Sequence, residues 1–145
     1  MKRFFYLFLL LPLVGCSKEK TESFIEEDSI VSHDYSEIEN RIIKWPKILS
    51  QEDKFYYGYI FSKTCGHCQE IKDKVIDYAI RKNNIYFVEF DNSIPIVGEI
   101  NSTINATYYE DIGILGTPTL LQIFDHTLIA NVAGSKNILS LLENQ

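Results

Sequence analysis

The sequence has too little material for a disulfide framework, a nucleic-acid interface or a membrane-spanning helix. Only three cysteines occur among the 145 residues, so no network of structural disulfides is available. Basic residues number 14 against 20 acidic ones, and the formal net charge of −6 argues against a nucleic-acid partner. The apolar run at residues 4–14 is shorter than the roughly 20 residues that a transmembrane helix needs. No internal repeat or low-complexity segment is present.

The chain does contain enough apolar material for a folded core. Hydrophobic residues make up 46% of the sequence and aromatic residues 13%. This composition is typical of globular chains and not of disordered ones. At this length we expect one domain with a modest core.

The N-terminus has the layout of an export signal. Lys2 and Arg3 precede the apolar run, which ends in the Leu-Val-Gly-Cys sequence of residues 13–16 and resembles the bacterial lipobox. That resemblance implies cleavage before Cys16, a diacylglyceryl group on its sulfur, and a lipid-anchored location on the extracytoplasmic face of the cell membrane. The alternatives are an ordinary signal peptide or an uncleaved anchor, each with a chance cysteine.

Three segments follow from this interpretation. Residues 1–15 are predicted to be a lipoprotein signal peptide, residues 16–33 a flexible acidic tether, and residues 34–145 the folded domain. The tether is polar and rich in glutamate, and a flexible chain of this length reaches about 20–25 Å. That reach is enough to hold the domain off the lipid surface.

Cys65 and Cys68 stand at a predicted strand-to-helix junction. Residues 55–61 form an aromatic and β-branched run, which predicts a buried strand. Downstream, apolar residues recur at helical spacing, at Ile71, Val75, Ile76, Ala79 and Ile80. Cys65 is therefore expected near a helix N-terminus, where free backbone N–H groups and the helix dipole favour thiolate over thiol.

The spacing of these two cysteines favours redox chemistry. Two intervening residues allow a disulfide across the first helical turn, so thiolate attack and disulfide closure are available at one place. A loop this small would be a poor stabilising cross-link. The alternative is half of a zinc site, which has only His33, His67 and His126 to complete it. We therefore predict no metal.

With the Cys-Gly-His-Cys sequence of residues 65–68, this region resembles the thioredoxin superfamily, and the motif looks like that of protein disulfide isomerase. A second match lies far along the chain, because residues 113–121 are similar to the family's cis-proline segment and the strand after it. The resemblance spans roughly residues 53–145. It implies a three-layer thioredoxin-like α/β fold, with a central mixed sheet flanked by helices.

The same resemblance implies roles for individual residues. Pro118 is expected to follow a cis peptide bond beside the cysteine pair, and the backbone of Thr117 to contact the substrate. Gly66 and His67, inside the motif, are expected to tune the redox properties. A histidine there favours a thiolate at Cys65, which stabilises the reduced form and makes the pair more oxidising.

The segment before the first strand departs from the family pattern. A helix is expected over residues 38–45, capped by Asp34 or Ser36. Pro46 would end it or start a second short turn. The strand that most thioredoxin-like domains place here is therefore expected to be absent or irregular.

The remaining elements follow from local patterns. Residues 85–90 predict a buried strand, and the apolar spacing over residues 96–104 predicts a helix that begins near Pro95. Residues 119–124 and 127–132 are close enough in sequence to form an antiparallel hairpin. An amphipathic helix is expected to close the chain.

Two further positions differ from thioredoxins near the motif. Thr64 stands where the family carries an aromatic residue before the first cysteine. Tyr59 stands at the position of the buried acid that moves protons to and from the second cysteine. Glu89 in the next predicted strand is a candidate replacement, although strand alternation places it as easily on the other face.

These features together predict an extracytoplasmic, lipid-anchored thiol–disulfide oxidoreductase that needs no cofactor. Cys65 is expected to attack and Cys68 to resolve the mixed disulfide. The expected partners are exported proteins with thiols or disulfides and a redox partner in the membrane. Two other classes stay open, namely a non-catalytic thioredoxin-like accessory protein that binds an exported, bacteriocin-type peptide, and a copper(I) metallochaperone that uses the two thiolates.

Overall fold

A four-stranded mixed sheet forms the centre of the chain in the computed structural model, which describes residues 31–145. The strands are β1 (Phe55–Phe61), β2 (Ile85–Glu89), β3 (Thr119–Phe124) and β4 (Thr127–Ala133). Their order is β2-β1-β3-β4, with β1 parallel to β2 and antiparallel to β3, and β3 antiparallel to β4. The four strands expected from the sequence are confirmed to within one residue at each end.

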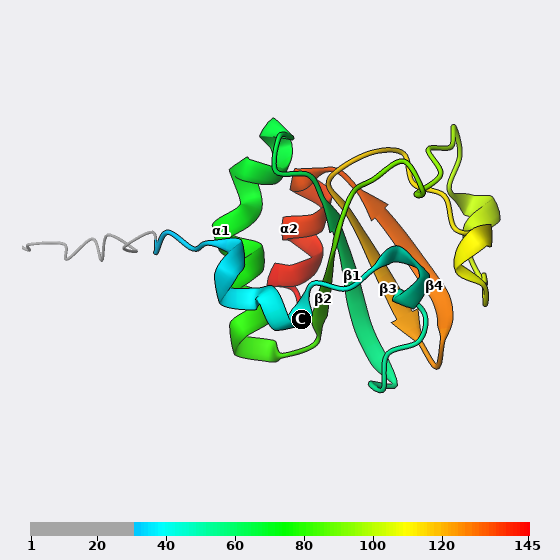
Figure 1. Cartoon of the computed structure of the whole chain (residues 1–145), viewed down its shortest axis with the longest axis horizontal. Helices are drawn as coiled ribbons and strands as arrows, with labels where there is room; N and C mark the ends of the chain where they lie inside the picture. Colours follow the sequence, from blue (N-terminus) through cyan, green and yellow to red (C-terminus); the bar gives the residue numbers. More distant parts are fainter. Residues whose placement is uncertain (1–30) are drawn as a thin grey trace, which may run out of the picture.

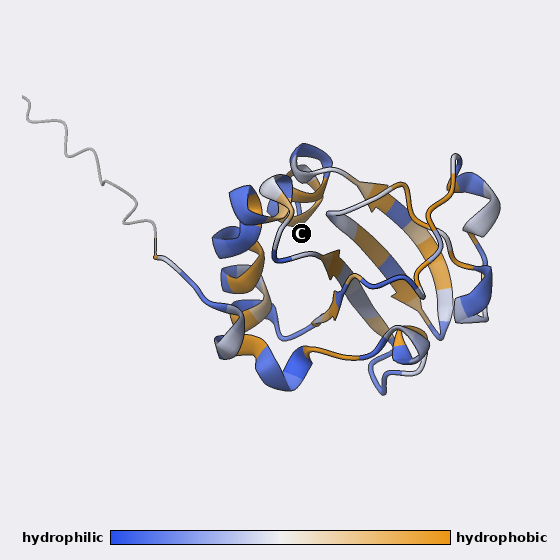
Figure 2. Cartoon of the chain, turned by 45° about the horizontal axis from the view of Figure 1, so that its top comes forward, coloured by the Kyte–Doolittle hydropathy of each residue, from blue (hydrophilic) through white to orange (hydrophobic). Residues whose placement is uncertain are grey.

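One face of the sheet is covered by helices. The helices α1 (Gly66–Lys82) and α2 (Ser135–Glu143) pack side by side there, and the short 3₁₀ helix η1 (Tyr35–Arg41) lies against α1 (Figure 1). Hydrophobic residues predominate in the strands, and α1 combines hydrophilic residues with hydrophobic ones that include the buried Ile71, Val75 and Ile76 (Figure 2). The cluster under these helices takes residues from β1, β2 and β3 and includes Cys68.

Shorter elements cover the opposite face. The 3₁₀ helix η2 (Trp45–Lys47) and the segment between β2 and β3 pack a second apolar cluster against the sheet. That segment contains the 3₁₀ helices η3 (Asn101–Thr103) and η4 (Tyr109–Asp111), and it runs beside β4 (Figure 1). The result is the predicted three-layer thioredoxin-like α/β fold, with an outer layer of short helices and irregular chain on this face.

The helix predicted over residues 96–104 is wrong. The N–H of Val97 donates to the carbonyl of Ile114 at 2.9 Å, and the N–H of Ile114 donates to the carbonyl of Pro95 at 2.9 Å. A parallel bridge thus pairs Ile96 with Ile114. The carbonyl of Pro95 thus bonds to Ile114 instead of accepting from the N–H of Glu99, as a helix beginning there would require, and only the three residues of η3 are helical in this segment.

The start of the domain also differs in part from the expectation. Asp34 caps η1, because its carboxylate accepts a hydrogen bond from the N–H of Ser36 while the Glu37 side chain accepts from the N–H of Asp34. The helix is 3₁₀ and ends at Arg41, so it is shorter than predicted. A single parallel bridge between Ile42 and Phe87 stands where a first strand was expected to be absent or irregular.

Residues with positive φ end α1 and connect β3 to β4. Asn83 adopts the left-handed conformation at φ 58° and ends α1. Asp125 and His126 both have positive φ and connect β3 to β4 in a tight hairpin.

The predicted signal peptide, Cys16 and most of the predicted tether lie outside the described residues. Within residues 31–145, no helix combines the length and the apolar character needed to cross a bilayer.

Candidate functional site

Cys65 is the N-cap residue of α1. Its backbone is extended, at φ −84° and ψ 117°, and its Sγ accepts a hydrogen bond from the N–H of Cys68 at 3.2 Å. Its carbonyl accepts from the N–H groups of Cys68 and Gln69 at 3.1 Å each. The sulfur therefore occupies the place where free backbone donors begin the helix, as the sequence predicted.

A distant segment faces the same sulfur. The thiol of Cys65 donates a hydrogen bond to the carbonyl of Thr117 at 3.3 Å, across 52 residues of sequence. The bond between Thr117 and Pro118 is cis, as the resemblance implied. Two further bonds hold this corner, from the Thr119 hydroxyl to the carbonyl of Gly116 at 2.7 Å and from the N–H of Gly134 to the carbonyl of Pro118 at 3.0 Å.

The pKa values of the two cysteines are shifted in opposite directions. Burial of Cys65 disfavours its anion, but hydrogen bonds from the Cys68 and Thr117 side chains and from the backbone N–H groups of Cys68 and His67 outweigh it, so the pKa of Cys65 is lowered. Cys68 is fully buried, and this burial together with its hydrogen bond to Cys65 raises the pKa of Cys68 to about 11. Both are free thiols in this structure. Cys65 is thus the more readily ionised of the pair.

The residues between the cysteines point away from the core. The His67 side chain is 79% exposed, and its Nδ1 lies 3.3 Å from a carboxylate oxygen of Glu70. Glu70 also accepts a hydrogen bond of 3.5 Å from the hydroxyl of Ser135 at the start of α2. Gly66 begins α1 with open space where a side chain would stand, so packing does not require glycine there. What His67 contributes to the lowered pKa of Cys65 is its backbone N–H.

Glu89 does not take the place of the buried acid. Its carboxylate lies at the surface, 46% exposed and 3.1 Å from the Nζ of Lys63. Tyr59, which stands at the position of the family's buried acid, is fully buried. Around Cys68, the described part of the chain therefore offers a phenol where thioredoxins have a carboxyl group.

Tyr35 is a site neighbour that the sequence did not reveal. It belongs to η1, is 8% exposed, and its ring stacks on that of Phe61 with centroids 4.1 Å apart. Phe61 is the last residue of β1 and leads directly into the cysteine motif. No local pattern marks Tyr35, because its partners come from another part of the chain.

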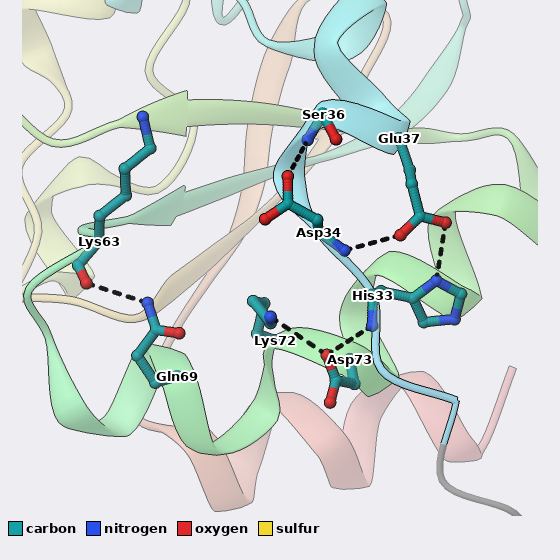
Figure 3. A network of polar contacts seen from close by, with 8 residues as sticks. All are labelled: His33, Asp34, Ser36, Glu37, Lys63, Gln69, Lys72 and Asp73. Atoms are coloured by element: carbon teal, nitrogen blue, oxygen red, sulfur yellow. Dashed lines mark hydrogen bonds and ion pairs between the residues drawn. The ribbon is translucent and has the colours of Figure 1, made fainter.

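Polar contacts hold η1 on the first half of α1 (Figure 3). The N–H of His33 donates to Asp73 at 2.9 Å, and the His33 ring lies 3.0 Å from Glu37. A groove of about 400 Å³ lies between η1 and α1, with Lys63 and Lys72 among its lining residues and neither cysteine among them. These contacts fix the position of Tyr35 and leave the groove separate from the dithiol.

The three histidines do not converge on the cysteines. The ring of His33 lies beside Glu37 and that of His67 beside Glu70, whereas the Nδ1 of His126 lies 2.8 Å from the carbonyl of Leu49. The side chain of His126 therefore connects the β3–β4 turn to the chain after η2. Among residues 31–145, no group of three or more histidine, cysteine or acidic side chains is arranged to hold a metal ion.

No family model and no curated protein matches the chain. Among solved structures, the long form of thioredoxin f from spinach chloroplast is 19% identical, covers 79% of this chain and 96% of its own, and has a TM-score of 0.46. The Plasmodium falciparum thioredoxin is 14% identical, with coverages of 72% and 97% and a TM-score of 0.47. Mitochondrial thioredoxin 3 from Saccharomyces cerevisiae is 12% identical, with 73% and 97% covered and a TM-score of 0.46. At these values the likenesses carry no argument by themselves, and the fold is assigned from the topology of the chain.

Proposed function

We propose that the chain is a lipid-anchored thiol–disulfide oxidoreductase on the extracytoplasmic face of a membrane. The observation that supports this most directly is the pair of thiols on one helical turn with opposite pKa shifts, the outer one against the carbonyl of Thr117. An exchange reaction needs one thiol that ionises easily and is reachable, and a second that stays protonated until the first has reacted. Cys65 and Cys68 meet these two requirements.

The chemistry proceeds in two exchanges. The Cys65 thiolate attacks one sulfur of a substrate disulfide, which forms a Cys65–substrate disulfide and releases the other substrate sulfur as a thiolate that takes a proton. Cys68 then loses its proton and attacks the Sγ of Cys65, which closes the Cys65–Cys68 disulfide and releases the second substrate sulfur. In total, two electrons and two protons pass from the dithiol to the substrate. The reverse sequence oxidises a substrate dithiol.

The site bears on the direction of the exchange. A lowered pKa at Cys65 means that its thiolate is stabilised, and this stabilisation exists only while the pair is reduced. It therefore makes the pair more oxidising. A reductase-like potential near −270 mV and an isomerase-like one near −180 mV differ by about 4 kcal/mol, so modest contributions decide between these classes.

The anchor and the partners rest on the sequence. The Gly15-Cys16 step at the end of the apolar run supports lipidation of Cys16, and export supports substrates among secreted protein thiols and disulfides with a redox partner in the membrane. Two acyl chains give durable attachment where one gives marginal binding. The Cys16→Ser variant should accumulate as unprocessed precursor or leave the membrane fraction. Cys68→Ser is the matched control and should stay processed and membrane-bound, whereas unchanged mass and retention in Cys16→Ser would refute the anchor.

The activity is tested by the reduction potential of the pair together with turnover. The full-length protein is equilibrated in thiol buffers of graded potential, and reduction of a protein disulfide such as insulin is followed. A reversible two-electron transition with turnover, lost in Cys65→Ser, supports the oxidoreductase. A dithiol that shows no turnover in a protein that still binds peptide would indicate the accessory role. Tight copper(I) binding lost in both cysteine variants, again without turnover, would indicate the metallochaperone.

A further inference from the structure

The groove between η1 and α1 lies close to the dithiol and has no part in the exchange steps themselves. Its volume is about 400 Å³, and its lining includes Lys63 and Gln69 from the two flanks of the cysteine motif. Lys63 is two residues before Cys65, so their Cα atoms lie within about 7 Å of each other. A polypeptide that is held at Cys65 can therefore reach the groove over a few residues.

The two lysines that line the groove are already paired. The Nζ of Lys63 lies 3.1 Å from a carboxylate oxygen of Glu89 at the end of β2, and in Figure 3 its side chain points away from Gln69. The Nζ of Lys72 lies 3.4 Å from a carboxylate oxygen of Asp73. Both positive charges are thus offset by acids that do not line the groove.

The two acids that line the groove have no cationic partner. Asp34 and Glu39 belong to the cap and the body of η1, and within residues 31–145 neither carboxylate lies at ion-pair distance from a basic side chain. The N–H of Ser36 donates to Asp34 at 2.9 Å, and this bond is the main cause that lowers the pKa of Asp34. Gln69 donates its Nε2 to the carbonyl of Lys63 at 3.0 Å. The groove therefore offers carboxylate and amide oxygens as acceptors.

The charge and the apolar part of the lining suit an arginine side chain. When the acids paired with the lysines are included, the groove and its border carry two more negative than positive charges. Ile42 and Tyr35 contribute apolar surface to the same lining. An arginine covers apolar surface with its methylene groups and donates up to five hydrogen bonds from a planar, permanently charged head.

We propose that this groove is a second contact site for the substrate polypeptide and takes an arginine side chain near the reacting cysteine. The guanidinium donates to the carboxylates of Asp34 and Glu39, while the stem lies along Ile42 and Tyr35. An extended chain places such an arginine about three to five residues from the cysteine. The inference rests on the proposed exchange function and narrows its substrates to basic segments.

The test compares peptides that differ in one charge. Each peptide carries one cysteine as a mixed disulfide with a coloured aromatic thiol, and either arginine or its neutral isostere citrulline at a set distance from that cysteine. Attack of the Cys65 thiolate on the peptide sulfur joins peptide to protein and releases the aromatic thiolate, which is followed by its colour. With arginine at the preferred distance, the second-order rate constant for full-length protein should be about fivefold higher than with citrulline.

Variants of the two acids assign this preference to the groove. Asp34→Asn and Glu39→Gln remove one charge each, and asparagine still caps η1. Each should lower the ratio of the arginine rate to the citrulline rate, and the double variant should bring it close to one. Glu52→Gln removes the same charge before β1, at the end of that strand far from the motif, and should keep the ratio. Because the ratio is taken within each variant, general changes in folding or reactivity cancel.

Three results would overturn the proposal. They are a ratio near one at every distance in the parent protein, an equal loss of the ratio in Glu52→Gln, and a preference for glutamate over glutamine in parallel peptides. The last result would assign the groove to acidic segments through its lysines.

A binding measurement separates failure of this proposal from failure of the exchange function. Peptides with serine in place of cysteine are titrated into the reduced full-length protein in detergent, and the NMR signals of the Gln69 side-chain amide are followed. These signals should shift with the arginine peptide and much less with the citrulline peptide. Such shifts without release of aromatic thiol would support the groove and count against the exchange function. Release with no arginine preference and no shift would overturn the groove alone.

Discussion

Cys65 and Cys68 lie one helical turn apart but in two different regions of the molecule. Cys65 is at the edge, or rim, of the domain, where its sulfur accepts a hydrogen bond from the N–H of Cys68 at 3.2 Å, which favours the thiolate, and its thiol donates to the carbonyl of Thr117 at 3.3 Å. Cys68 is in the interior, within the cluster that contains Tyr35 and Tyr59. Hydrogen bonds to its sulfur lower the pKa of Cys65, whereas burial raises the pKa of Cys68. Identical side chains thus acquire different chemistry from backbone donors on one side and burial on the other.

Under the proposed function, this difference would give the exchange reaction an order. The thiol that ionises more readily would react with substrate, and the buried one would react once a disulfide has formed at Cys65. Selective changes at each cysteine should therefore have unequal and predictable consequences.

The largest expected effect is on turnover. Cys65→Ser should abolish disulfide exchange, because the interior thiol is neither ionised nor accessible. Cys68→Ser should keep the first attack and accumulate a mixed disulfide with substrate, detectable by mass spectrometry. Cys16→Ser serves as the control and should retain turnover in detergent. Mixed disulfides on Cys68 in the Cys65→Ser protein would show that the assignment of rim and interior roles is reversed.

The next effect is on alkylation of the reduced protein near neutral pH. The pKa difference gives Cys65 more than about 100-fold the thiolate population of Cys68, and the lower nucleophilicity of a more acidic thiolate offsets about tenfold of this. Cys65 should therefore be labelled at least about tenfold faster, as measured by peptide mapping after short exposure. Equal rates would mean that the helix N-terminus does not activate Cys65.

The two thiols should also change the free energy of unfolding in opposite directions as pH rises through the ordinary thiol pKa. The folded-state pKa of Cys68 is raised, so its contribution is complete below the ordinary thiol pKa and is lost as pH rises toward 11. Between about pH 8 and pH 10, the reduced protein should lose roughly 1–1.5 kcal/mol more unfolding free energy than Cys68→Ala does. Denaturant titrations at each pH measure this difference.

For Cys65 the sign is reversed. Its folded-state pKa is lowered, so its contribution is present above the ordinary thiol pKa and is lost as pH falls through the folded-state pKa. Cys65→Ala should therefore flatten the stability profile on the acidic side of that window. The same slope for both alanine variants would contradict the opposite shifts.

The smallest effect is expected on the reduction potential when His67 is changed. Two variants distinguish the contribution of its ring from that of its backbone N–H. His67→Pro removes both the imidazole and an N–H that stabilises the Cys65 thiolate, so the potential should become more negative by some tens of millivolts. His67→Gln keeps the N–H and removes only a ring that is 79% exposed, and should shift the potential less. Equal shifts in the two variants would assign the tuning to the imidazole, which the sequence alone favoured.

Much of the fold could be predicted from local patterns. The strands over residues 55–61 and 119–124 were expected with the bounds that the structure shows, because buried aromatic and β-branched runs have few alternatives. The left-handed Asn83 and the Asp125-His126 turn are equally local, since both depend on which residues tolerate positive φ. The position of Cys65 at the N-terminus of α1 follows from this same junction of strand and helix.

The failed helix over residues 96–104 shows where local patterns end. Its apolar spacing is helical, but the backbone groups of Pro95 and Val97 bond to Ile114, 17 or more residues away. The local spacing of apolar residues does not indicate such hydrogen bonds to a distant segment. The preference of the segment is decided by the partner it meets in the folded molecule.

The sequence by itself therefore determined the cysteine motif, its strand–helix setting and the main strands, whereas the export signal stays a prediction. Only the tertiary structure decided which groups surround the sulfurs. It brought Thr117 to Cys65, turned Glu89 outward to Lys63, and stacked Tyr35 from η1 on Phe61. The physical reason is that proton affinity depends on burial and on donors a few ångströms away, and these come from segments that are far apart in the chain.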